Sequence, residues 1–181
     1  GAPSPGTGGA AAGKGQGGPR PSDSIGIVDR PYGRYRTDAF RDRSRPHLRV
    51  FIDSNIPMYV AGGPRENREP ACRLLDRVQT RKLEACTSTE VLQEILYRYS
   101  SLGRLDLARE VYDLFVDICP VVLGVTLADT DRARDLLCST AGISARDSVH
   151  AAVMLNNDVE WIATFDAGFE RVKGIRRLKM T

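Results

Sequence analysis

The stretch LRVFIDSN at Leu48–Asn55 decides the fold. Its β-branched and aromatic residues, Val50, Phe51 and Ile52, predict a short buried strand. That strand ends on Asp53, and ligands of open α/β sheets bind beyond the carboxyl ends of the strands. Asp53 therefore stands where chemistry can take place. An Asp that caps the following helix is the competing interpretation.

Apolar periodicity along the rest of the chain predicts that strands alternate with helices. The expected strands are residues 48–52, 83–86, 120–123, 161–164 and 175–180, and the expected helices are residues 55–60, 69–82, 87–99, 105–118, 129–139 and 145–156. The helix from Thr87 has the S/T-x-x-E pattern of a capping box, with Glu90 as its acid. Strands separated by helices predict an α/β fold with a parallel sheet of four to five strands and helices on both faces.

Composition narrows the class of protein. The 181 residues are enough for one domain with a tail. No apolar run approaches the roughly 20 residues of a membrane span, and the first residues lack a secretory signal pattern. Four scattered cysteines without C-x-x-C spacing predict reduced core thiols of a cytoplasmic protein, and two histidines exclude a histidine-rich metal site.

The positive charge belongs to the N-terminal segment. Residues 1–46 hold eight basic and four acidic side chains, which gives them a charge of +4 and leaves −1 on residues 47–181. The Gly/Pro-rich residues 1–22 are expected to be disordered, followed by an Arg-rich arm, and residues 47–181 form the folded domain. The arm fits a solvated tether, an RNA-contacting segment or a segment that folds back on an acidic site. Part of it also fits a linker or an expression remnant.

Four acidic residues occupy comparable places in the predicted elements. Asp53 and Asp166 follow strands, Glu94 lies one turn into the helix after the second strand, and Asp147 lies in the first turn of its helix. Parallel strands place their carboxyl ends on one edge of the sheet, so the four carboxylates are expected to converge there.

Such a cluster of carboxylates is tenable only if protons or cations occupy it. Two carboxylates ~5 Å apart repel by roughly 3 kcal/mol at an effective dielectric constant of about 20. Oxygen ligands favour Mg²⁺ or Mn²⁺ over zinc. An acidic cluster that holds Mg²⁺ suits phosphodiester chemistry, because the ion activates a water and stabilises the leaving oxygen.

Each residue also has a plainer interpretation. Asp147 fits an acid that favours a helix N-terminus, and Asp166 fits a turn residue. His150 fits a packing residue better than a base. Arg146 and Arg98 fit solvated surface arginines better than contacts to substrate phosphates.

Four sequence blocks resemble the PIN-domain ribonucleases, and most of all their bacterial VapC-type toxins. These blocks are FIDSN, TSTEVLQEIL, RDSVHAAV and ATFDAGF, in family order over residues 48–181. The resemblance implies that the four acids are the catalytic and metal-binding residues Asp53, Glu94, Asp147 and Asp166. It also implies that Asn55 and Thr164 orient the first carboxylate.

The resemblance further implies a PIN-like three-layer fold and a Mg²⁺- or Mn²⁺-dependent endoribonuclease that cleaves RNA with a metal-activated water. It implies a homodimer and a cognate antitoxin whose tail covers the acidic groove. Two features depart from the family: Gly168 replaces a frequent extra acid, which weakens the case for a tightly bound second ion, and residues 1–46 precede the first strand.

Other functions stay open at this point. The fold also suits a catalytically weak RNA-binding module, or an RNA-processing nuclease outside a toxin–antitoxin pair. A phospho-aspartyl phosphatase built on Asp53 is disfavoured, because such enzymes usually need an acid where Asn55 stands.

Deletion of residues 1–46 distinguishes the three roles of the arm. We expect a solvated tether, whose removal leaves RNA cleavage and RNA affinity unchanged. Faster cleavage by the truncated protein would instead indicate that the arginines dock on the carboxylates. Weaker RNA binding with a flatter salt dependence would indicate that they contact RNA.

Overall fold

The computed structural model describes residues 1, 49–62 and 66–180. Apart from Gly1, the arm predicted for residues 1–46 lies outside this part of the chain. Within the described residues, five parallel strands form one sheet in the order β3-β2-β1-β4-β5. The predicted α/β class and the parallel sheet are confirmed.

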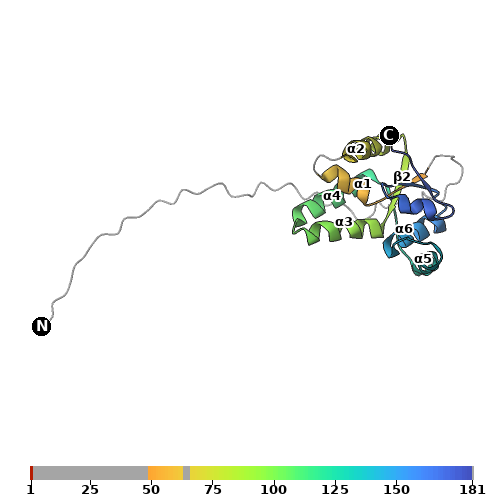
Figure 1. Cartoon of the computed structure of the whole chain (residues 1–181). Coiled ribbons are helices and arrows are strands. Elements are labelled where there is room, and N and C mark those ends of the chain that lie inside the picture. Colours follow the sequence, from red (N-terminus) through yellow and green to blue (C-terminus); the bar gives the residue numbers. More distant parts are fainter. Residues whose placement is uncertain (2–48, 63–65, 181) are drawn as a thin grey trace. The chain divides into compact units, whose positions relative to one another are not determined.

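Helices connect the strands along the chain (Figure 1). The elements are β1 Arg49–Ile52, α1 Asn55–Ala61, α2 Arg68–Gln79, β2 Glu84–Ser88, α3 Thr89–Ser101, α4 Leu105–Ile118, β3 Val121–Leu123, α5 Leu127–Ser139, α6 Ala145–Asn156, β4 Trp161–Ala163, the 3₁₀ helix η2 Ala167–Arg171 and β5 Arg176–Arg177. The last strand is much shorter than the predicted 175–180.

The sheet order fixes which helices cover which face. From β1 the chain steps outward to β2 and β3 through α1–α4, and it then returns to β4 on the other side of β1 through α5 and α6. Right-handed crossovers therefore place α1–α4 on one face and α5 and α6 on the other. The helix contacts agree, because α1 packs on α2, α3 packs on α4, and α5 packs on α6. The three layers follow, and the carboxyl ends of β1, β2 and β4 meet at one edge.

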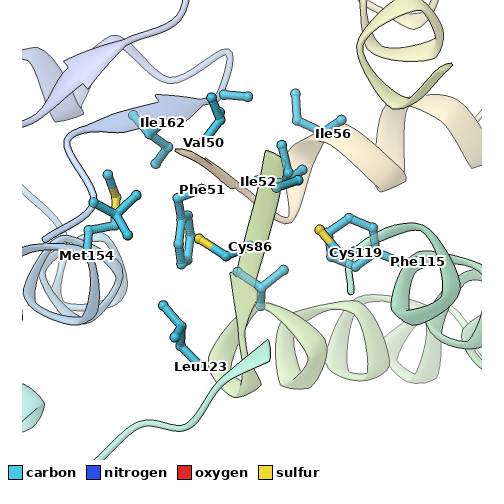
Figure 2. Packing of buried hydrophobic residues seen from close by; sticks show 14 of the residues in the cluster. Val50, Phe51, Ile52, Ile56, Cys86, Phe115, Cys119, Leu123, Met154 and Ile162 are labelled. Atoms are coloured by element: carbon cyan, nitrogen blue, oxygen red, sulfur yellow. The ribbon is translucent and has the colours of Figure 1, made fainter. Parts of the chain in front are cut away.

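The central strand β1 is the middle of the core (Figure 2). Val50, Phe51 and Ile52 are fully buried, as the all-apolar run predicts for a parallel strand covered on both faces. Phe51 pairs in register with Cys86 of β2, and both belong to the same core cluster as Met154 of α6 (Figure 2). Packing on both faces therefore fixes the position of β1, and with it the position of Asp53, which follows the strand directly.

Two predictions of detail are wrong. The helix α3 is capped by Ser88, whose hydroxyl accepts the Val91 N–H, and not by Thr87, whose hydroxyl instead donates to the Ile52 carbonyl of β1. Glu90 therefore has no capping-box role. The extra two residues of β2 explain the shift, because Thr87 and Ser88 still belong to the strand.

The cysteines divide into two groups. Cys86 and Cys119 are buried free thiols, and burial raises the pKa of both. Cys72 is half-buried, and Cys138 is exposed, so the prediction of core thiols is wrong for Cys138.

Among the residues that the structure describes, every helix is too short or too polar to traverse a lipid bilayer.

Asp129 ties α5 to α6. Its Oδ2 accepts the backbone N–H of Thr126 at 2.8 Å and the Thr126 hydroxyl at 2.6 Å, which completes a capping box at the start of α5. Its Oδ1 accepts the Asn156 side chain at the end of α6 at 2.7 Å. Burial would raise the pKa of Asp129, but these hydrogen bonds outweigh it and lower the pKa.

We predict that Asp129→Ala lowers the free energy of unfolding by about 1–2 kcal/mol at pH 7. Because the folded-state pKa is lowered, the ionised carboxylate stabilises the fold above its ordinary pKa near 3.8, and this contribution is lost as the pH falls through the lowered value. Urea unfolding between pH 7 and pH 3 should therefore show the difference from wild type shrink below about pH 4. Asp131→Ala on the same helix, which removes an exposed ion pair with Arg134, is the control and should change stability by less than about 0.5 kcal/mol.

Candidate functional site

The four predicted acids line one cleft at the carboxyl edge of the sheet. The cleft has a volume of about 520 Å³, and its lining residues are Asp53, Ser54, Asn55, Glu94, Ser144, Ala145, Arg146, Asp147 and Asp166. They come from the end of β1, from α3, from the start of α6 and from the segment after β4. Parallel topology thus brings together side chains that are up to 113 residues apart in the sequence, from 53 to 166.

The acids differ in depth. Asp53 and Glu94 are each only 5% exposed and form the floor, Asp147 is half-buried, and Asp166 is exposed at the rim. The floor pair is the unusual feature, because two carboxylates in one buried place repel and lose hydration.

Asp53 is held by neighbouring donors on both oxygens. Its Oδ1 accepts the Ser54 N–H at 2.6 Å. Its Oδ2 accepts the Asn55 amide and the Thr164 hydroxyl, each at 2.6 Å. Burial outweighs these bonds and the charge of His150, so the pKa of Asp53 is raised. Asp53 does not cap α1, whose N-cap residue, Ser54, makes no side-chain capping bond.

Thr164 and Asn55 connect the two strand ends. The Asn55 side chain donates to the Thr164 hydroxyl at 2.8 Å, and that hydroxyl also accepts the Asp166 N–H at 3.0 Å. The structure therefore places both residues in contact with Asp53. The same hydroxyl fixes the backbone that carries Asp166.

Glu94 accepts three donors. The Ser54 hydroxyl donates to its Oε2 at 2.5 Å, while Oε1 lies 2.9 Å from His150 Nε2 and 3.1 Å from Arg146 Nε. Burial would raise the pKa of Glu94, but the bonds from His150 and Ser54 and the nearby charge of Arg146 outweigh it, so the pKa is lowered. An ionised Glu94 thus sits against two cationic or potentially cationic groups.

His150 packs in the core, as expected, and also contacts Glu94. Its ring is buried, packs against Phe51 at a centroid distance of 5.7 Å and contacts Glu94, while its Nδ1 has no hydrogen-bond partner among the described residues. Burial would lower the pKa of His150, but the bond to Glu94 and the charge of Asp53 outweigh it and raise the pKa. The sequence offered one signal for this contact: His150 lies three residues, one helical turn, after Asp147.

The rim acids have local duties as well. Asp147 N–H donates to the Ser144 hydroxyl, the N-cap of α6, and that hydroxyl donates to Asp147 Oδ2 at 2.6 Å. Asp166 Oδ1 accepts the Gly168 N–H at 2.7 Å at the start of η2. Both plainer interpretations therefore hold, yet each carboxylate still lines the cleft.

The space around Gly168 favours glycine at this position. A Cβ at this position would lie 3.0 Å from Asp166 Oδ1, closer than almost all real Cβ contacts. A side chain here would require Asp166 Oδ1 to move by a few tenths of an ångström.

Sequence reasoning missed Ser54, Ser144 and the contact of Arg146 with Glu94. The pattern S-A-R-D at Ser144–Asp147 matches a helix N-cap followed by an acid, so Ser144 was detectable. Ser54 was not, because its hydroxyl reaches Glu94, which is 40 residues away.

The donor set fits a hard divalent cation. One ligand atom from each of Asp53, Glu94 and His150 lies within 4.8 Å of the others. His150 Nδ1 is buried without a hydrogen-bond partner among the described residues, and burial raises the pKa of Asp53. A bound cation would offset the burial of the two neighbouring carboxylates. Asp147 and Asp166 line the same cleft but lie outside this close group of ligand atoms; their carboxylates are of the kind that Mg²⁺ and Mn²⁺ prefer.

Comparison with known proteins gives a consistent picture. The PIN domain family matches residues 50–175. Ribonuclease VapC13 of Mycobacterium tuberculosis and VapC ribonuclease Mb1869c of Mycobacterium bovis are each 36% identical over 129 residues, which cover 71% of this chain and 98% of theirs. Ribonuclease VapC23 of M. tuberculosis is 34% identical over 120 residues, which cover 65% of this chain and 92% of its own.

Solved structures share the fold at lower identity. VapBC2 from Rickettsia felis, bound to a promoter DNA fragment, matches with a TM-score of 0.59 and 15% identity over 72% of this chain and 98% of that one. DNA-bound VapBC from Salmonella typhimurium matches with a TM-score of 0.57 and 19% identity over 72% and 97%. The likeness supports the architecture of the sheet and its helices.

We predict that Thr164→Val lowers the free energy of unfolding by about 1–3 kcal/mol, because the fully buried hydroxyl serves Asp53, Asn55 and the Asp166 backbone at once. Chemical denaturation at pH 7 measures the change. Thr87→Val is the matched control: its hydroxyl is equally buried but makes one bond, to the Ile52 carbonyl. A loss at Thr164 no larger than the loss at Thr87 would contradict a shared structural role for this hydroxyl.

Proposed function

The chain belongs to the PIN-domain family of VapC-type ribonucleases, and we propose that its acidic cleft is the site of divalent-metal-dependent RNA cleavage. The observation that carries the proposal is the buried pair Asp53 and Glu94 on the floor of a cleft that Asp147 and Asp166 also line. Two buried carboxylates lower the stability of the fold when no cation is bound, because they repel each other. When a cation is bound, they serve as its ligands.

In this proposal Asp53, Glu94, Asp147 and Asp166 hold the ion, which is Mg²⁺ or Mn²⁺. When bound, such an ion polarises a phosphodiester and makes a water molecule more acidic. Asn55 and Thr164 orient Asp53, because their two hydrogen bonds leave its Oδ2 little freedom to rotate. The Ser54 hydroxyl orients Glu94 in the same way.

The different depths of the four acids in the cleft suggest that the buried pair and the rim pair have different roles. Asp53 and Glu94 are too buried to contact a polynucleotide directly, so they act on the ion. Asp147 and Asp166 lie nearer the mouth, where they can reach both an ion and the solvent around it. With Gly168 at the turn, none of the described residues adds a fifth carboxylate to the cleft lining, and we propose one tightly held ion.

The proposal also covers the protein's inhibitor and its oligomeric state. We propose that a cognate antitoxin neutralises the enzyme, that the enzyme is a cytoplasmic homodimer, and that residues 47–181 are the nuclease domain. The support is that the VapC ribonucleases are relatives at 36% identity and that solved proteins of this fold include toxin–antitoxin complexes. An acidic cleft suits an inhibitor segment that presents a cation.

We predict that Glu94→Gln keeps the fold but reduces RNA cleavage by at least about 100-fold. The amide can accept from His150 with its oxygen and donate to the Ser54 hydroxyl with its nitrogen, so the buried contacts survive. The lost negative charge weakens cation binding. Cleavage of single-stranded RNA with Mn²⁺ measures activity, and the Mn²⁺-induced rise in melting temperature measures binding.

Glu90→Gln is the matched control, because Glu90 lies one turn earlier on α3 and is not among the cleft-lining residues. It should retain wild-type cleavage and the full Mn²⁺ response. If Glu94→Gln cleaves RNA as fast as the wild type, the proposed site is wrong. Cation binding without cleavage in the wild-type protein would favour an RNA-binding module in place of a nuclease.

A further inference from the structure

We propose that Arg146 is a substrate-positioning residue that serves two partners in turn: it pairs with Glu94 in the cation-free cleft and, once a divalent cation takes that carboxylate, binds a phosphate of the RNA. The inference rests on the proposed function and adds to it the group that receives the substrate's negative charge.

Arg146 occupies the right place for both partners. It lies in the first turn of α6, directly before Asp147, and it lines the cleft. Its Nε is 3.1 Å from Glu94 Oε1, yet its side chain is 53% exposed while that of Glu94 is 6% exposed. The guanidinium thus reaches from solvent down to the cleft floor.

The charges of the cleft single it out. Four of the lining residues are acidic, and Arg146 is the basic residue among the described side chains that line the cleft. An RNA phosphate that enters this cleft meets carboxylates on the rim, Asp147 and Asp166, before it reaches the floor. Arg146 is therefore the protein's own counter-charge for the substrate at this place.

Glu94 Oε1 cannot serve every partner at once. His150 Nε2 already lies 2.9 Å from this oxygen and is fixed there by burial against Phe51. A cation that takes this oxygen therefore competes with the more exposed of its two neighbours, Arg146. The Arg146 side chain is 53% exposed, so water can solvate the guanidinium when it leaves, while the arriving cation takes over the neutralisation of the buried Glu94 carboxylate.

The released guanidinium has the chemistry for a phosphate. Its planar array of N–H donors matches two phosphate oxygens, and it stays charged at all relevant pH values. Because Arg146 is anchored by the helix that also carries Asp147, the released group remains beside the cleft. In this exchange, cation binding releases the Arg146 guanidinium, which can then bind RNA.

The test is Arg146→Gln, examined for two properties that should move in opposite directions. Mn²⁺ binding to the full chain without RNA, measured by isothermal titration calorimetry, should tighten by about threefold to tenfold, because a competing positive charge is gone. The KM for a mixed-sequence single-stranded oligoribonucleotide with a fluorophore and a quencher should rise by about tenfold or more at saturating Mn²⁺. The slope of log KM against log salt concentration should flatten by about 0.7, the value for one lost phosphate contact on a single strand.

Arg146→Lys and Arg98→Gln complete the design. Lysine keeps the charge but not the planar fork, so its Mn²⁺ affinity should stay near that of wild type while KM rises by an intermediate amount. Arg98 is exposed on α3 and does not line the cleft, so Arg98→Gln should change neither property.

Each failure has its own signature. Unchanged or weaker Mn²⁺ binding by Arg146→Gln overturns the competition with the cation, and an unchanged KM overturns the phosphate contact. A mere structural role would weaken both properties together and also overturns the inference. Failure of the proposed function is seen before any Arg146 variant is compared, as the absence of Mn²⁺-dependent RNA cleavage by the wild-type protein, and the inference falls with it.

Discussion

The repulsion between two buried carboxylates at the end of the central strand is the constraint on which the site depends. Asp53 and Glu94 lie together on the cleft floor with almost no access to water. Such a pair persists only if surrounding donors and cations offset the lost hydration. Ser54 donates to both acids, through its N–H to Asp53 and its hydroxyl to Glu94. Ser54 thus fixes the positions of the two carboxylates relative to each other.

The fold explains why this arrangement is tolerated. β1 is buried on both faces and paired to β2 and β4 on both sides, so the position of Asp53 is set by packing that has nothing to do with its charge. The neighbouring strand β4 delivers Thr164 to the same carboxylate. The energy of the hydrophobic core therefore supports a polar edge that would not assemble by itself.

Local rules predicted most of the strands and helices and placed the four acids at the boundaries of those elements, although β5 is shorter than predicted. Apolar runs mark β1 and β4, and strand-end acids mark Asp53 and Asp166. What the sequence could not supply was the partner of each hydrogen bond. Thr87 has the local pattern of a helix cap, yet its hydroxyl bonds to Ile52, which is 35 residues away. A long-range contact replaced the local one there, and the bond of His150 to Glu94 is another contact between residues far apart in the sequence, 56 residues.

The three donors on Glu94 carry this argument one step further. Ser54 and His150 are buried, and their bonds are bound up with the packing of the core, whereas Arg146 approaches from solvent. A carboxylate held by two buried groups and one exposed group can keep its position when the exposed group leaves. In the exchange that we propose, the Arg146 guanidinium therefore gives way to a metal ion while Glu94 stays in place. Such an arrangement suits a site that must accept an ion and a polyanion in succession, since the geometry of the acids stays the same while the charge around them changes.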